Sequence, residues 1–177
     1  MPHIPLPPLP GIAGLLAAHP DTAGALNNLA ETLLRGPSPL TAAERETIAA
    51  YVSRRNDCDF CARTHAAVAH RLGPEFDNVL AGDVEAAGPK MRALLAIADR
   101  VRVDGRAVTP HDIADARAAG ADDRTVHDTV LIAAAFCMFN RYVDGLAATT
   151  PDDQAQYDRH AHHLAENGYL GNGKAGR

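Results

Sequence analysis

The chain of 177 residues has the length of one domain or of a compact domain with tails, and its 46% hydrophobic and 22% charged residues are typical of a folded globular protein. Its formal charge of -5 argues against nucleic acid or an anionic membrane as the main partner, because both attract clustered lysine and arginine. The longest apolar run, VLIAAAFCMF at 130–139, is too short for a membrane span, so we expect no membrane contact and a cytoplasmic location.

The first twenty residues predict an extended, proline-rich arm. The stretch MPHIPLPPLPG at 1–11 lacks the basic and apolar regions of a secretory signal, and its prolines favour an extended chain. A single helical domain is expected over 21–171, followed by a flexible tail over 172–177. Because no segment alternates convincingly between apolar and polar residues, the predicted fold class is all-α.

Several segments carry the signals of helix starts and stops. TAAE at 41–44 is a capping box, with Thr41 as N-cap and Glu44 at the third helical position, and this helix is expected to run to about Arg55. GPKMRALLAIADRVRVDG at 88–105 predicts a half-buried helix. TPHD at 109–112 and TPDD at 150–153 both place an acid at N3 after a Thr cap and a Pro, which predicts two further helix starts.

A longer helix is expected from about Asp123 to Ala148. It carries apolar residues on all its faces, which predicts a place in the middle of a bundle or at a subunit interface. Cys137 within the apolar run is expected to be a small core residue. Asn140 and Arg141 follow ten apolar residues and are costly to bury unpaired, so they either cap the run at the surface or bond across an interface.

The segment NDCDFCARTH at 56–65 combines two cysteines with a histidine. Asn56 and Asp57 interrupt the preceding helix and are good caps, so a second helix is expected to begin near Cys58. That helix is expected to end at Leu72, because Gly73 follows it. The two cysteines therefore lie at the start of a helix.

Helix geometry places Cys58, Cys61 and His65 on one face. At 100° per residue the three side chains span roughly 60° of the helix surface. Cysteines three positions apart have Cα atoms roughly 5 Å apart, so a disulfide between them needs little backbone movement. The helix dipole, the unpaired amides of the first turn and His65 all favour a thiolate. The dipole points to Cys58 as the reactive thiol, whereas proximity to His65 points to Cys61.

A thiolate in such a pair is able to attack a hydroperoxide, forming a sulfenic acid that the second thiol converts to a disulfide. Two alternatives stay open at this stage. Two buried cysteines without a role are one of them. A zinc site is the other, and it would need a further ligand from the histidines at positions 70, 160, 162 and 163, brought close by tertiary folding.

ETIAAYVSRRNDCDFCARTHAAVAHRL at 46–72 resembles the core of the AhpD-like (alkylhydroperoxidase D) family, within the carboxymuconolactone decarboxylase-like superfamily. The family pattern is a Glu, a CxxC pair, and a His four residues after the second Cys. Glu46, Cys58, Cys61 and His65 occupy that pattern. DTVLIAAAFCMFNRYVDGLA at 128–147 and HLAENGYL at 163–170 resemble the peroxidase-related branch of the family.

The resemblance implies an AhpD-like helical bundle with its CxxC core over about 41–103, assembled as a dimer, trimer or hexamer. It implies reduction of small hydroperoxides without cofactor or metal, with a protein or small thiol as reductant. Carried over to this chain, Cys61 is the attacking thiol and Cys58 the resolving thiol. His65 is the base and later the acid, and Glu46 orients His65.

One position departs from the founding members of the family, which carry a further histidine between the two cysteines. This chain has Phe60 there, so the implied proton relay is shorter. An alternative function is a redox-responsive helical oligomer that does not turn over efficiently. Another is a lactone enzyme like the superfamily's decarboxylases, although many of those lack the dithiol.

Overall fold

The structure is a computed structural model that describes residues 1–170. Over this range the chain forms helices and short 3-10 turns and no strand, which confirms the predicted all-α class. The α-helices are α1 (Gly11–Ala18), α2 (Pro20–Arg35), α3 (Ala42–Arg55), α4 (Asp59–Leu72), α5 (Asp77–Ala81), α6 (Pro89–Val103), α7 (Pro110–Ala118), α8 (Asp123–Gly145) and α9 (Gln154–Asn167). The predicted tail at 172–177 lies outside the described residues. None of the helices within 1–170 has the length and apolar character needed to span a membrane.

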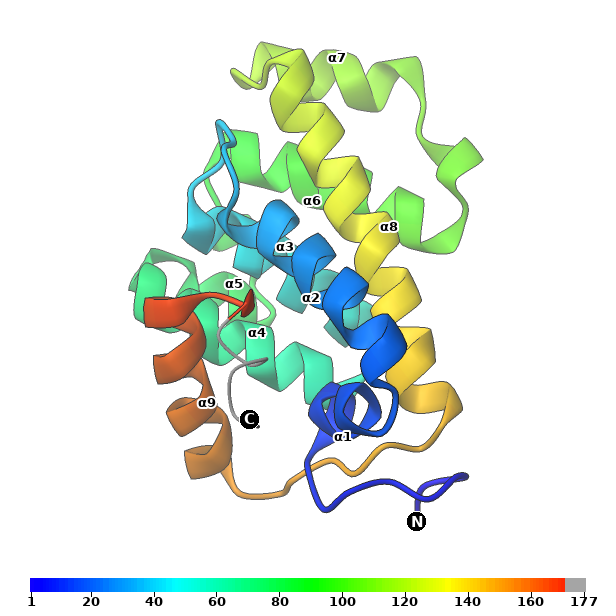
Figure 1. The fold of residues 1–177 in the computed structure, drawn as a ribbon. Coiled ribbons are helices and arrows are strands. Elements are labelled where there is room, and N and C mark those ends of the chain that lie inside the picture. Colours follow the sequence, from blue (N-terminus) through cyan, green and yellow to red (C-terminus); the bar gives the residue numbers. More distant parts are fainter. Residues whose placement is uncertain (171–177) are drawn as a thin grey trace.

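Helix α3 lies at the centre of the bundle. It packs most extensively against α4 and also contacts α6 and α8, while α9 packs against α4. The 23-residue helix α8 runs along most of the molecule, from α7 at one end to α1 at the other (Figure 1). The main core lies where α3, α6 and α8 meet, and its fully buried side chains include Ile48, Leu94, Leu95 and Ile132. Burial of each such side chain stabilises the fold by roughly 1.5–3 kcal/mol.

The local helix signals are confirmed for three of the predicted starts. Thr41 Oγ1 accepts a hydrogen bond from the amide of Glu44, and the Glu44 carboxylate accepts one from the amide of Thr41, which is the expected capping box. Thr109 and Asp112 form a second capping box at the start of α7. Helix α4 begins next to Cys58 as predicted, but its N-cap is Cys58 itself and not Asn56 or Asp57, since Asn56 is the C-cap of α3.

The predicted helix start at TPDD is wrong. Helix α9 begins at Gln154, and its N-cap is Asp153, whose side chain accepts a hydrogen bond from the amide of Ala155. The carbonyl of Pro151 instead accepts hydrogen bonds from Arg63 and from the hydroxyl of Tyr157, each 3.0 Å long. These tertiary bonds hold the segment outside the helix.

The N-terminal arm is extended only over its first ten residues, because α1 and the start of α2 fall within the stretch expected to be extended. The arm is also docked against the bundle. The amide of His3 donates to the carbonyl of Leu146, and the amide of Gly11 donates to the carbonyl of Thr149. Leu15 in α1 is fully buried. Helix α1 therefore belongs to the folded body.

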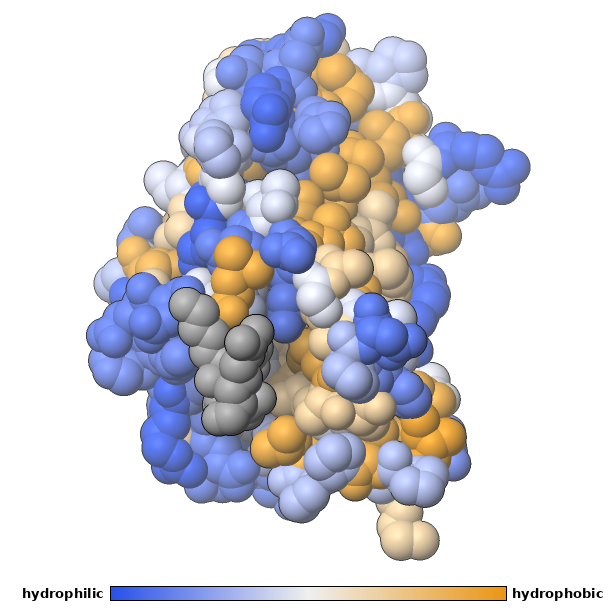
Figure 2. Space-filling view, viewed as in Figure 1, coloured by the Kyte–Doolittle hydropathy of each residue, from blue (hydrophilic) through white to orange (hydrophobic). Residues whose placement is uncertain are grey.

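Helix α8 differs from its prediction in two respects. It ends at Gly145 rather than near Ala148, and one of its faces is open, since Leu131 and Met138 are 40% and 42% exposed. A band of hydrophobic residues follows this helix on the molecular surface (Figure 2). Cys137 lies between that face and the core and is only partly buried, so its assignment as a core residue is corrected to the edge of the core.

The two polar residues after the apolar run have separate environments. Asn140 is 1% exposed, and its side-chain amide donates to Ser53 and accepts from Asn56, at 2.9 Å in both cases. Asn140 thus joins α8 to the end of α3 within one chain. The sequence predicted either a cap at the surface or a bond across an interface, and this role is neither of the two. Arg141 is exposed and donates to the carbonyl of Cys137, consistent with a cap at the surface.

Candidate functional site

The turn between α3 and α4 places the site residues of both helices side by side. Asp57 has a φ of 59°, in the left-handed region, and this reverses the chain at the end of α3. The amide of Cys58 then donates to the carbonyl of Ser53. The two helices pack closely along their length because the facing residues Ala49 and Ala50 of α3 are small and buried.

Glu46 and His65 meet across this pair of helices. His65 Nδ1 lies 2.6 Å from Glu46 Oε2, and Glu46 is fully buried. A carboxylate only accepts hydrogen bonds, so His65 Nδ1 carries the proton and Nε2 is the nitrogen left to take one up. The contact places Glu46 beside His65, and its role in orienting the histidine stays a prediction.

Two further residues complete the environment of Glu46, and sequence reasoning missed both. The hydroxyl of Tyr169 donates to Glu46 Oε1 at 2.7 Å, and Arg35 Nη1 lies 2.7 Å from the same oxygen. The Tyr169 hydroxyl also lies 3.3 Å from His65 Nδ1. Arg35 has no local signal that distinguishes it from a surface arginine, and the only sequence signal at Tyr169 is its place in HLAENGYL.

These neighbours determine the charge of Glu46. Burial alone would raise its pKa, but the charge that His65 carries when it is protonated, the hydrogen bond of His65, the charge of Arg35 and the hydrogen bond from Tyr169 outweigh burial and lower the pKa below its usual range. Burial raises the pKa of Tyr169 well above its usual value, and the charge of Glu46 adds to this. Glu46 is therefore an anion and Tyr169 a neutral donor at pH 7.

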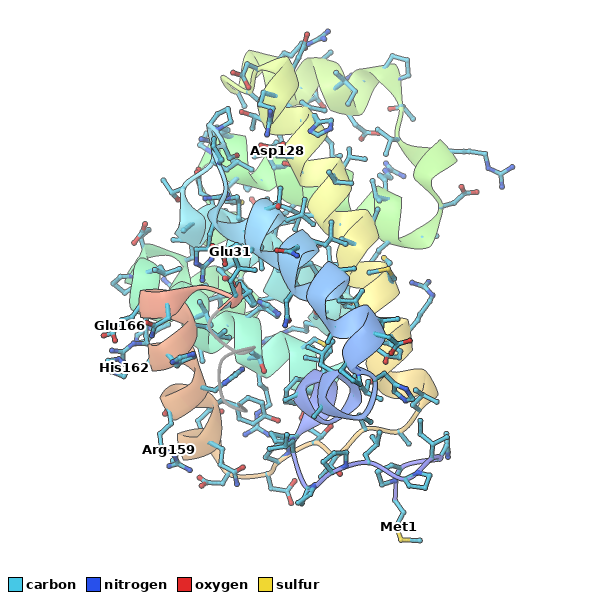
Figure 3. The ribbon with its side chains drawn as sticks, viewed as in Figure 1. Met1, Glu31, Asp128, Arg159, His162 and Glu166 are labelled. Atoms are coloured by element: carbon cyan, nitrogen blue, oxygen red, sulfur yellow. The ribbon has the colours of Figure 1, made fainter. Side chains whose placement is uncertain are left out.

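The segment after α9 holds Tyr169 in place. Gly168 has a φ of 65° and a ψ of -158°, a combination that favours glycine, and a Cβ at this position would also crowd the Glu31 carboxylate. Glu31 Oε2 accepts a 2.7 Å hydrogen bond from the amide of Tyr169. Glu31 lies on α2 beside this segment (Figure 3). The Arg35 guanidinium lies 5.2 Å from the centre of the Tyr169 ring, which adds a cation–π contact.

Cys58 and Cys61 are both free and buried, at 0% and 4% exposure. Both belong to the same buried cluster. The pKa of Cys58 is raised, first because its thiol hydrogen-bonds to Cys61 and second because burial disfavours the thiolate. Cys58 is therefore a protonated thiol in the reduced protein, next to the slightly more accessible Cys61.

A cavity of about 700 Å³ opens beside Cys61. Helices α1 and α2 form one wall with mostly apolar side chains, among them Ile12, Leu16 and Leu26. The opposite wall comes from α4, α8 and α9 and carries Cys61 and His65. Apolar pockets with a few convergent polar groups are the usual form of small-molecule sites in proteins.

The structure thus brings the predicted residues together. Cys61 and His65 line the cavity, Glu46 contacts His65 from behind, and Cys58 lies next to Cys61. A second cavity, of about 470 Å³ between α3, α5 and α6, contains none of these residues. Within residues 1–170 no three His, Cys, Asp or Glu side chains are grouped so as to hold a metal ion, so the zinc alternative lacks a ligand set there.

Comparison with known proteins gives one family match. Residues 20–100, which include all four predicted site residues, match the carboxymuconolactone decarboxylase family. No curated protein sequence gives a match to the chain.

Two solved structures share the fold over most of the chain. An uncharacterized peroxidase-related protein from Silicibacter sp. TM1040 is 25% identical with a TM-score of 0.74, and the match covers 84% of this chain and 78% of that one. An uncharacterized peroxidase-related protein from Ralstonia eutropha JMP134, described as an alkylhydroperoxidase AhpD core, is 26% identical with a TM-score of 0.75. That match covers 85% of this chain and 80% of the other.

Proposed function

We propose that this chain is a thiol-dependent, peroxidase-like oxidoreductase of the AhpD-like carboxymuconolactone decarboxylase superfamily, and that it reduces hydroperoxides with Cys61 and Cys58. One observation carries the proposal. Cys61 and His65 line the same apolar cavity, while the buried carboxylate of Glu46 holds His65 with one ring nitrogen free to accept a proton.

In the first step, His65 Nε2 takes the proton of the Cys61 thiol, and the thiolate attacks the outer oxygen of the hydroperoxide. An S–O bond forms and the O–O bond breaks. The leaving alkoxide takes the proton back from His65 and becomes an alcohol. Cys61 is then a sulfenic acid.

In the second step, the sulfur of Cys58 attacks the sulfur of Cys61. An S–S bond forms, the S–O bond breaks, and the departing hydroxide takes the proton that Cys58 gives up, which produces water. The two thiols lose two electrons and the hydroperoxide gains them. A thiol reductant, either a small molecule or a protein, restores both cysteines.

The assignment of Cys61 as the attacking thiol rests on three features. Cys61 lines the cavity, it is one turn from His65, and the pKa of its neighbour Cys58 is raised. The cavity wall also favours organic hydroperoxides over hydrogen peroxide, because its side chains are mainly apolar. Phe60 adds to that wall where the founding family has a histidine.

The test is a count of thiols after cumene hydroperoxide is added to the reduced protein. We expect two of the three thiols to be lost together. Cys61→Ser should abolish the reaction, and Cys58→Ser should stop it at a sulfenic acid on Cys61 that dimedone traps for mass spectrometry. Cys137→Ser is the matched control and should react like the wild type. Loss of a single thiol in the wild type, or full reaction of the Cys61→Ser variant, would refute the mechanism.

A second candidate function is a redox-responsive protein that does not turn over. It is favoured by the burial of the dithiol, since Cys58 is 0% exposed and a large reductant has little access to it. Steady-state consumption of hydroperoxide with dithiothreitol separates the two functions, because a sensor would consume one equivalent and stop. A lactone enzyme would keep its activity when both cysteines are replaced by serine.

We also propose that the protein is a cytoplasmic homo-oligomer. A dithiol cycle requires a compartment that keeps thiols reduced. The open face of α8 presents Leu131 and Met138 to solvent, and a second copy of the chain would cover them. Light scattering of the purified protein measures the number of subunits.

A further inference from the structure

Several polar groups line the cavity, and they differ in their hydrogen bonding. The ring of His65 and the hydroxyl of Tyr169 are already hydrogen-bonded to Glu46, so their contacts are met within the protein. Thr64 and His160 are different. Both line the same cavity, and neither side chain forms a hydrogen bond with another residue in the part of the chain that the structure describes.

Thr64 is unusual among the buried threonines in the helices. Thr47 Oγ1 donates to the carbonyl of Ala43, and Thr129 Oγ1 donates to the carbonyl of Thr125, four residues earlier in each case. Thr64 is 4% exposed, and its Oγ1 has no partner within residues 1–170. A buried hydroxyl without a partner is unfavourable, so its presence beside a cavity calls for a ligand that supplies the missing hydrogen bond.

His160 approaches the cavity from α9. The neighbouring rings of His162 and His163 hydrogen-bond to Arg71 and Asn167, whereas the ring of His160 faces the cavity. Burial lowers the pKa of His160, and His65 and His163 lower it further whenever they are protonated. At pH 7 the ring is therefore neutral, with one N–H donor and one acceptor nitrogen.

We propose that Thr64 and His160 form a subsite that binds the oxygen head of an amphipathic ligand, with its apolar body lying toward α1 and α2. Thr64 is one helical turn from Cys61 on the same face of α4, so the subsite holds the head next to the thiol. If the proposed function is correct, the head is the hydroperoxyl group of the substrate and then the hydroxyl group of the alcohol product.

The test measures binding rather than turnover, so it does not depend on the proposed function. 2-Phenyl-2-propanol and tert-butylbenzene have nearly the same shape, but only the alcohol has a hydroxyl group. Each is titrated into the reduced protein by NMR. Thr64→Val and His160→Phe should each weaken binding of the alcohol about fivefold to tenfold, as loss of one hydrogen bond predicts, and leave binding of the hydrocarbon unchanged.

Two control variants lie outside the cavity. Thr129→Val removes a buried helical hydroxyl that has its own partner, and His163→Phe changes a histidine on the same helix as His160. Both should bind the two ligands like the wild type. Thr64→Val should also be at least as stable to heat as the wild type, because it removes an unpaired hydroxyl.

The proposal is overturned if the alcohol binds both subsite variants as tightly as the wild type, or if the hydrocarbon loses as much affinity as the alcohol. These outcomes are separate from those of the thiol count. If the protein binds the alcohol through Thr64 and His160 but its thiols are not oxidised by hydroperoxide, the subsite proposal stands and the proposed peroxidase function is refuted.

Discussion

Tyr169 donates a 2.7 Å hydrogen bond to Glu46, although 123 positions separate them in the chain. This bond connects the segment after α9 to the centre of α3 and so to the histidine of the proposed relay. Glu46 accepts from three sources at once, namely His65, Arg35 and Tyr169. The carboxylate is fully buried, and each of the three partners therefore compensates for part of its lost hydration.

The first prediction concerns this tyrosine. Tyr169→Phe should lower the free energy of unfolding by about 1.5–3 kcal/mol, the usual range for a hydrogen bond to a charged group. It should also slow the loss of thiols with hydroperoxide, because Glu46 no longer has a fixed position behind His65. Urea unfolding and stopped-flow oxidation measure the two effects. Tyr142→Phe is the control, since the Tyr142 hydroxyl forms no hydrogen bond within residues 1–170, and an equal effect there would contradict the prediction.

The second prediction follows from the lowered pKa of Glu46. Its ordinary value is 4.5 in the unfolded chain, and the folded value is lower, so the carboxylate contributes its full stabilisation above about pH 4.5 and loses it as the pH falls through the folded pKa. Glu46→Gln should lower the free energy of unfolding by about 3–5 kcal/mol at pH 7, because it leaves Arg35 without its anion. The difference in unfolding free energy between variant and wild type should become smaller below pH 4.5.

Urea titrations at several pH values from 7 to 3.5 measure that difference. Glu85→Gln is the matched control, because the Glu85 side chain is 84% exposed and its ion pair with Arg92 lies at the surface. The control should change stability by less than about 1 kcal/mol at any pH. A difference for Glu46→Gln that stays constant down to pH 3.5 would show that the charge of Glu46 does not stabilise the fold.

The third prediction concerns Gly11, which connects the arm to the site. Its φ is 50°, and a Cβ at this position would lie 2.2 Å from the ring of Phe60. Gly11→Ala should therefore destabilise the protein by more than about 1 kcal/mol and speed the alkylation of the cysteines, because α1 must move away from Phe60. Thermal unfolding and the rate of iodoacetamide labelling are the two measurements.

Gly24 provides the comparison for Gly11. It lies in the interior of α2, and nothing is within 4 Å of an added Cβ, so Gly24→Ala should stabilise the protein by about 0.4–1 kcal/mol. We therefore expect Gly11→Ala to lower the free energy of unfolding and Gly24→Ala to raise it. If both variants have the same stability, the contact between Gly11 and Phe60 does not constrain α1.

Residues that act over short distances in the chain were predictable. Thr41 and Glu44 form a capping box because both partners lie within one helical turn, and Cys61 and His65 share a face of α4 for the same reason. The starts of α3, α4, α6, α7 and α8 follow from such signals, whereas the short helix α5 was not predicted. The contact between Glu46 and His65 required the family resemblance as well, because the sequence alone does not determine how two helices face each other.

The remaining site residues depend on tertiary folding. Arg35 and Tyr169 reach Glu46 from α2 and from the segment after α9, and no local pattern links either residue to the CxxC pair. The wrong start for α9 has a similar origin, since Arg63 on another helix bonds to the carbonyl of Pro151. Thr64 was visible within the quoted motif, but its unpaired hydroxyl becomes apparent only when its surroundings are known.

The long separation between His65 and Tyr169 also affects the order in which the site is made. The two residues are 104 positions apart, and ribosomes add roughly 5–20 residues per second, so the dithiol and its histidine are synthesised about 5–20 seconds before the tyrosine. During that interval Glu46 lacks one of its three partners. A newly made chain therefore carries both cysteines well before it carries the complete relay, and the site matures only as the last helix docks.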